Sequence, residues 1–176
     1  MSSVDERTER HRVFFALWPD EATRAAISRA TREAVRASGG RPIAKERLHV
    51  TVAFLGELSA SGLDVARGVP PISVGPFELL LDAVGIWPES KILWLAPSST
   101  PDALGQLEAR LWDTLVDRGF RAEERVYRPH LTLARRARPV ETTVEPVRFA
   151  VRDLALVESF PEARNVHYEV LERWPL

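Results

Sequence analysis

The stretch LHVTVAFLGEL, residues 48–58, decides how this chain folds. Its first half is apolar except for His49 and Thr51, which are two positions apart. In a β-strand, side chains two positions apart point to the same face. We therefore predict a strand over residues 48–55, closed by Gly56, with an imidazole and a hydroxyl on one face and aliphatic side chains on the other.

The same pattern returns in PHLTLAR, residues 129–135, which places His130 and Thr132 in a second apolar strand. Each copy follows a predicted helix, and within each copy the two polar residues lie about 6.6–6.8 Å apart along one face. Two copies of a small αβ unit indicate two lobes related by a pseudo-twofold axis. If the two strands lie side by side at the centre, both histidines and both threonines converge on one cleft.

The composition is that of a globular domain, with 176 residues, a formal net charge of −1 and 45% hydrophobic residues. No run of 18 apolar residues predicts a membrane span, and the polar start MSSVDERTERHR has no signal-peptide core. The absence of cysteine excludes disulfides, Cys-ligated zinc and thiol catalysis, and fits a reducing cytoplasm. We expect a disordered lead-in over residues 1–11, one bilobal domain over 12–176, and a cytoplasmic location.

Periodicity and turn signals predict an α+β protein with antiparallel sheets, because helices and strands do not alternate regularly. Helices are expected over 21–37 and from Thr100-Pro101 to Gly119, and residues 59–75 are expected to be a loop with at most a short helix. Further strands are expected over 12–18, 77–86, 91–96, 128–134, 147–158 and 166–174.

Two histidines that face each other across a substrate form an acid–base couple, because an imidazole pKa near 6.5 allows one neutral and one protonated ring. Threonine hydroxyls can donate hydrogen bonds to anionic oxygens. Two histidines without a nearby carboxylate or cysteine are a poor metal ligand set, so we expect no metal and no cofactor. This combination favours phosphodiester chemistry by positioning and charge stabilisation.

The paired motifs LHVTVAFLG and PHLTLAR resemble the two His-x-Thr signatures of the two-histidine (2H) phosphoesterase superfamily. The resemblance is closest to its RNA 2′,3′-cyclic phosphodiesterase branch, also called the 2′-5′ RNA ligase family, and extends to RVFFALWPDE and FELLLDAVGIWP. It implies two antiparallel sheets lining a central cleft, with helices packed outside. The chain departs from the family in its short, Pro-rich 59–75 connection and in Asn165, where a glycine is usual.

The resemblance implies metal-independent hydrolysis of a 2′,3′-cyclic phosphate to the 2′-phosphate. His130 would accept a proton from water, His49 would donate one to the leaving oxygen, and Thr51 and Thr132 would bind the phosphate oxygens. The nearly symmetric motifs do not order the acid and base roles by themselves. The expected partner is an RNA end or a nucleotide with a 2′,3′-cyclic phosphate. We expect the protein to be a monomer that does not bind a membrane.

Lower-ranked candidates for substrate binding are Arg135, Phe54 and Phe15, with Phe14 as the alternative to Phe15. Phe54 and Arg135 stand five residues after each histidine and could hold a base between them by stacking and cation–π contact. Strand parity places the fifth residue on the opposite face unless the strand ends or bulges first. The remaining aromatic and basic candidates are expected to be solvated (His11), structural (His167), core (Trp87, Trp94, Trp112) or at the cleft rim (Tyr127, Arg128).

Three rival interpretations stay open at this point. The same couple could act on ADP-ribose 1″,2″-cyclic phosphate or another small nucleotide, or could join RNA ends through a 2′-5′ bond. The chain could also be a non-catalytic nucleotide-binding module. Seven arginines against two acids between Arg118 and Arg138 would serve either an RNA end or a nucleotide.

Overall fold

The computed structural model describes residues 10–162 and 166–176. Ten strands, four α-helices and one short 3-10 helix follow one another in these residues. The strands are β1 His11–Leu17, β2 Arg41–Pro42, β3 Val50–Leu58, β4 Phe77–Leu81, β5 Ala83–Trp87, β6 Ile92–Ala96, β7 Leu131–Arg135, β8 Val147–Val151, β9 Asp153–Pro161 and β10 Val166–Pro175. The helices are α1 Glu21–Ala30, α2 Arg32–Ser38, η1 Lys45–Arg47, α3 Ala60–Arg67 and α4 Asp102–Asp117.

The strands form three sheets, and all strand pairs in the described residues are antiparallel. The first sheet has the order β10-β9-β1-β3, the second has the order β2-β7-β6-β5, and β4 pairs with β8 in a third. The two motif strands therefore lie in different sheets: β3 is an edge strand of the first, and β7 is an inner strand of the second. The predicted α+β class with antiparallel sheets is confirmed, but the motif strands are not hydrogen-bonded neighbours.

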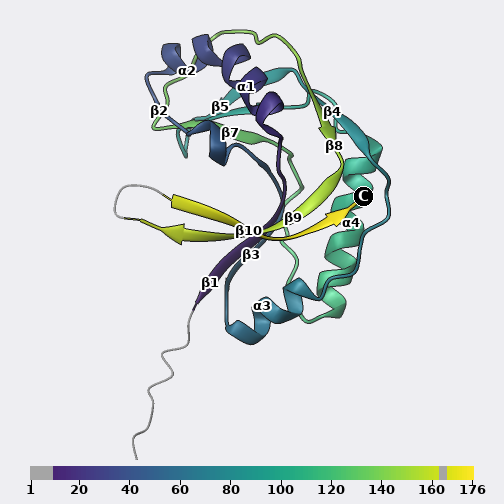
Figure 1. Ribbon diagram of the computed structural model, residues 1–176. Helices are drawn as coiled ribbons and strands as arrows, with labels where there is room; N and C mark the ends of the chain where they lie inside the picture. Colours follow the sequence, from purple (N-terminus) through teal and green to yellow (C-terminus); the bar gives the residue numbers. More distant parts are fainter. Residues whose placement is uncertain (1–9, 163–165) are drawn as a thin grey trace, which may run out of the picture.

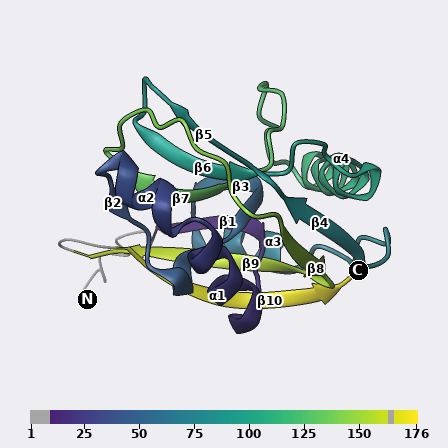
Figure 2. The same ribbon diagram turned by 90° about the horizontal axis from the view of Figure 1, so that it is seen from above.

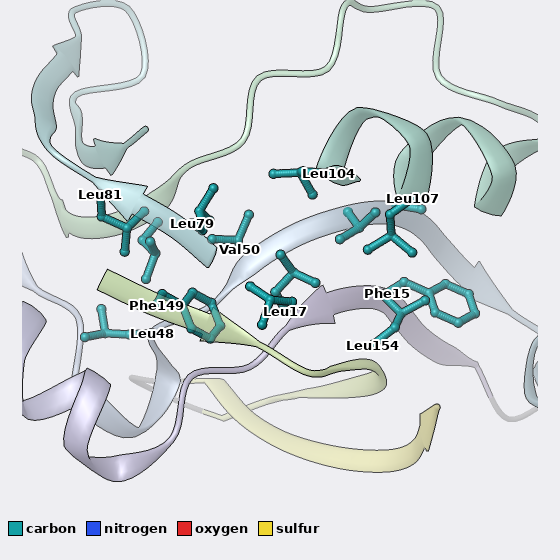
Figure 3. Close-up of a cluster of buried hydrophobic side chains, with 14 of the residues drawn as sticks. Phe15, Leu17, Leu48, Val50, Leu79, Leu81, Leu104, Leu107, Phe149 and Leu154 are labelled. Atoms are coloured by element: carbon teal, nitrogen blue, oxygen red, sulfur yellow. The ribbon is translucent and has the colours of Figure 1, made fainter. Parts of the chain in front are cut away.

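One hydrophobic core lies between the sheets and the helix α4. Phe15 and Leu17 of β1 pack in it with Leu107 of α4 and Phe149 of β8, all fully or nearly fully buried (Figure 3). These side chains occupy the face of β1 that points away from Phe14 and Ala16, because neighbouring residues of a strand point to opposite faces. The first sheet thus buries one face against the core, and its other face carries a smaller buried cluster that includes Phe14 and Ala16. Phe14 of that cluster also lines a cleft.

The helices pack outside the sheets. The helix α1 contacts β8, α3 contacts β1 and β3, and α4 contacts β3. Figures 1 and 2 show α1 and α2 together at one end of the molecule and α4 at the opposite end. No helix of the described residues is long and apolar enough to cross a membrane.

Several elements differ from the sequence prediction. The stretches 77–86 and 147–158 each divide into two strands, at Asp82 and Arg152, so that one half of each joins the third sheet. The helix predicted over 21–37 breaks at Thr31, whose buried hydroxyl donates to the Ile27 carbonyl at 2.8 Å. The short β2 was not predicted, and Pro101 caps α4 instead of occupying its first turn.

The expected lead-in overlaps the first strand, which starts at His11. The Nδ1 atom of His11 lies 2.7 Å from the Glu158 carboxylate, so this side chain is partly buried and paired instead of solvated. Residues 1–9 and Asn165 lie outside the described residues.

Gly85 of β5 provides a test of the packing in the second sheet. A Cβ atom added at Gly85 would overlap the indole of Trp94, whereas a Cβ at Gly105 in α4 would meet no atom within 4 Å. We expect Gly85→Ala to lower the free energy of unfolding by about 1–3 kcal/mol through overpacking. Gly105→Ala, the matched control, should raise it by about 0.5–1 kcal/mol because alanine favours the helix. Urea unfolding followed by fluorescence measures both, and equal stability of the two variants would contradict the described packing.

Candidate active site

His49 lies immediately before β3 and is enclosed by aromatic rings. Trp18 stacks on it with ring centroids 5.1 Å apart and an interplanar angle of 6°. Phe14 lies 4.9 Å away, and Tyr168 meets the imidazole edge-on at 5.3 Å. These contacts hold the ring in one orientation and remove much of its hydration.

His130 lies immediately before β7 and is less enclosed. One aromatic ring contacts it: Trp87 of β5 meets the imidazole edge-on, with centroids 4.4 Å apart. Trp87 is therefore partly exposed next to a motif histidine instead of in the core, where the sequence placed it. Trp94 also belongs to the cleft side of its sheet, because it pairs with Thr132. Trp112 is buried as predicted.

Both histidines are held by the same hydrogen bond. The Nδ1 atom of His49 lies 2.7 Å from the Arg47 carbonyl, and that of His130 lies 2.7 Å from the Arg128 carbonyl. A carbonyl oxygen can only accept, so Nδ1 carries the proton in both rings. Each neutral ring therefore has its lone pair on Nε2, the atom that is free for proton transfer.

The environments of the two histidines lower their pKa values unequally. Burial lowers the pKa of His49 to about 4, against a partial upward effect of the Arg47 hydrogen bond. The charge of a protonated His130 lowers the pKa of His49 further. Burial also lowers the pKa of His130. Near neutral pH the free protein therefore holds His49 in the neutral form.

Thr51 and Thr132 line one cleft of about 660 Å³, together with His49. Neither threonine hydroxyl forms a hydrogen bond with another described residue, so both are available to a ligand. The phenol of Tyr127, in the segment between α4 and β7, donates to the Thr51 carbonyl of β3 at 3.0 Å. Burial raises the pKa of Tyr127, which keeps this donor protonated.

A bulge in each motif strand brings the fifth residue after each histidine to the cleft. Ala16 and Phe14 of β1 are two residues apart, but their partners Thr51 and Phe54 are three apart. In the same way, Trp94 and Ile92 of β6 pair with Thr132 and Arg135. Since paired residues share a face, the extra residue returns Phe54 and Arg135 to the face of the threonines, and both line the cleft.

Phe15 is not a cleft residue, contrary to our expectation. It is fully buried in the core (Figure 3). Its ring centroid lies 5.6 Å from that of Trp174. Its neighbour Phe14 points to the opposite face and lines the cleft. The reason is strand alternation, which allows one of two adjacent phenylalanines to face the cleft.

The cleft is rich in arginine, and of these residues only Arg135 is predicted from the sequence. Arg10, Arg12 and Arg47 also line it, and Glu57 is its one lining acid within the described residues. The Nε atom of Arg47 is buried without a partner among the described residues, while its Nη1 donates to the Val166 carbonyl at 3.3 Å. The repeat of an arginine two residues before each motif histidine, in RLHVT and RPHLT, was a signal for Arg47.

The chain also matches a known protein family. A model of the 2'-5' RNA ligase superfamily matches residues 18–160. The chain therefore belongs to the 2'-5' RNA ligase superfamily, and the family predicted from the paired motifs is confirmed.

Individual relatives cover nearly the whole chain. It is 35% identical to an RNA 2',3'-cyclic phosphodiesterase of Escherichia coli K12, over 96% of this chain and 98% of the relative. A Thermus thermophilus protein of the same name is 30% identical over 94% and 90% of the two chains. The crystal structure of E. coli LigT complexed with 3'-AMP superposes with a TM-score of 0.83 at 32% identity, covering 96% and 99% of the chains.

The aromatic rings around His49 predict that its imidazole has a pKa well below the usual value of about 6.5. In the wild type, the His49 imidazole should titrate near pH 4 by NMR, because burial penalises its charged form. Trp18→Ala should raise this pKa toward 6.5 by admitting water. Trp87→Ala, whose ring contacts His130, is the matched control and should leave His49 near 4. A wild-type midpoint near 6.5 for His49 would refute the enclosure argument.

Proposed function

We propose that this chain is an RNA 2′,3′-cyclic phosphodiesterase that opens a ribose 2′,3′-cyclic phosphate to the 2′-phosphate. The observation that carries the proposal is the pair of motif histidines, each with Nδ1 fixed by a carbonyl and Nε2 without a partner among the described residues. Thr51 and Thr132 line the cleft beside His49, and neither hydroxyl bonds to another described residue. Relatives named for this reaction share 30–35% of their residues with this chain over nearly its full length.

The reaction requires one proton acceptor and one proton donor. Nε2 of His130 takes a proton from water as the water oxygen attacks phosphorus. The bond from phosphorus to O3′ breaks, and Nε2–H of His49 protonates O3′. The product carries the phosphate on O2′ and a free 3′-hydroxyl, and proton exchange with solvent restores both rings for the next turnover.

The other cleft residues bind the substrate. The hydroxyls of Thr51 and Thr132 donate to the two non-bridging phosphate oxygens, where charge increases in the transition state. Phe54 and Arg135 enter the cleft from opposite sheets and hold the base between a ring and a guanidinium. The five-membered cyclic phosphate is strained, so the reaction needs no metal ion.

The donor role of His49 requires that substrate binding restore its proton. Burial holds the free ring neutral, but a phosphate anion beside Nε2 favours the charged form and raises its pKa. His130 is less enclosed and stays neutral as a base above its own lowered pKa. The partner is an RNA end or a nucleotide, and we place the enzyme in the cytoplasm as a monomer.

Removing either histidine should abolish most of the activity. We expect His49→Ala and His130→Ala each to lower kcat by about 10²–10⁴-fold, the usual contribution of a positioned acid or base. The assay uses nucleoside 2′,3′-cyclic phosphates and an oligoribonucleotide with a cyclic end, in EDTA, and separates 2′- from 3′-phosphate products.

The exposed His167 on β10 provides the control, since its ring contacts only Phe160 among the described aromatic residues. His167→Ala should keep the wild-type rate. A wild type that opens none of these substrates would refute the proposed function and direct attention to ADP-ribose cyclic phosphate or to binding without catalysis. Loss of activity in EDTA would refute the metal-independent mechanism.

A substrate with sulfur in place of O3′ separates the two histidine roles. A thiolate leaves without being protonated, so the donor becomes dispensable while the base is still needed. The sulfur substrate should therefore restore turnover in His49→Ala by at least about tenfold relative to the oxygen substrate. It should not restore turnover in His130→Ala. Rescue of His130→Ala alone would reverse the assigned roles.

A further inference from the structure

Three rows of side chains follow one another along the cleft face of the first sheet. Residues Ala16, Phe14 and Arg12 of β1 lie two apart, so the rows are about 6.8 Å apart. Their partners on β3 are Thr51, Phe54 and Glu57. A second extra residue, between Phe54 and Glu57, places the Glu57 side chain on the same face of the sheet as Thr51 and Phe54. Thr51, Phe54 and Glu57 all line the cleft.

The first two rows already have ligand groups assigned. Thr51 binds the cyclic phosphate, and Phe54 carries the base, one row farther along. A base that stacks on Phe54 with its sugar and phosphate toward Thr51 extends along the strand, away from the phosphate. Its hydrogen-bonding edge therefore points toward the third row, which consists of Arg12 and Glu57.

The third row is poorly suited to a second phosphate and well suited to a base edge. The carboxylate of Glu57 would repel a phosphate, and it forms no hydrogen bond or ion pair with the other described residues. The guanidinium of Arg12 lies 5.2 Å from the centroid of the Phe54 ring. A base that stacks on Phe54 replaces this cation–π contact and frees the guanidinium to donate hydrogen bonds.

We propose that Glu57 and Arg12 form a base-edge site that makes this enzyme prefer a terminal guanine, a specificity that rests on the proposed phosphodiesterase function. Guanine presents two adjacent N–H donors, N1–H and N2–H, that match the two oxygens of a carboxylate, which can only accept. It also presents O6 and N7, the acceptor pair that arginine binds.

The other bases fit this pair less well. Uracil offers one N–H between two carbonyl oxygens, which a carboxylate repels. Adenine and cytosine each place their amino group next to an unprotonated ring nitrogen, so one carboxylate oxygen would face a lone pair. The expected order of kcat/KM is guanine first and uracil last.

The test compares the four nucleoside 2′,3′-cyclic monophosphates as substrates of the wild type, Glu57→Gln and Glu145→Gln. We expect the wild type to turn over the guanosine substrate with at least about tenfold higher kcat/KM than the uridine substrate, the size of one bidentate base contact. Glutamine at position 57 carries one acceptor and one donor, which suit N3–H and O4 of uracil. Glu57→Gln should therefore reduce the guanosine-to-uridine ratio to about one by improving uridine turnover.

Glu145 is exposed on the connection to β8 and lies outside the cleft lining, so Glu145→Gln loses the same charge and should keep the wild-type ratio. A wild type that opens all four substrates at similar rates would overturn the base-edge site and leave the phosphodiesterase function intact. The same conclusion follows if Glu57→Gln keeps the wild-type ratio. A wild type that opens neither these nucleotides nor a cyclic RNA end would overturn the function itself.

Discussion

A strand with one buried face can present only every second residue to a cleft, and both motif strands depart from this rule where an extra residue follows the threonine. The extra residue in β3 and in β7 allows Val52 and Leu133 to stay in the core while Phe54 and Arg135 join the threonines on the cleft face. Bulges commonly occur next to active sites because they redirect a side chain without moving the sheet. The cleft wall, the substrate contacts and the base-edge row all depend on these local shifts.

The two motifs are symmetric in their hydrogen bonds and asymmetric in their surroundings. The same Nδ1–carbonyl bond orients both imidazoles, but three aromatic rings enclose His49 and one contacts His130. A symmetric pair would have equal pKa values, whereas an acid–base couple needs two rings in different protonation states. The aromatic residues around His49 make the two sites different, but they favour its neutral form, so the donor role proposed for His49 depends on the bound phosphate anion.

The charge of the cleft also differs from the charge of the whole chain. The net charge of −1 gives no sign of an anionic substrate, yet arginines from β1, η1 and β7 meet in the cleft with one glutamate. Fields from several arginines in a cleft attract an anion regardless of the total charge. The local arrangement, and not the composition, therefore carries the electrostatic argument for a phosphate ligand.

The sequence by itself determined the α+β class, the helix α4, most strand positions and the four motif residues, because these depend on local periodicity and on repetition of one motif. It did not determine that 77–86 and 147–158 split between sheets, that Phe14 instead of Phe15 faces the cleft, or that Trp87 and Trp94 leave the core. Those outcomes depend on which strand pairs with which and where a bulge shifts the register, and pairing between distant segments leaves no local pattern. Only the tertiary structure brings Arg12, Arg47 and Glu57 into one cleft with His49, because contacts between separate strands are made when the sheets pack.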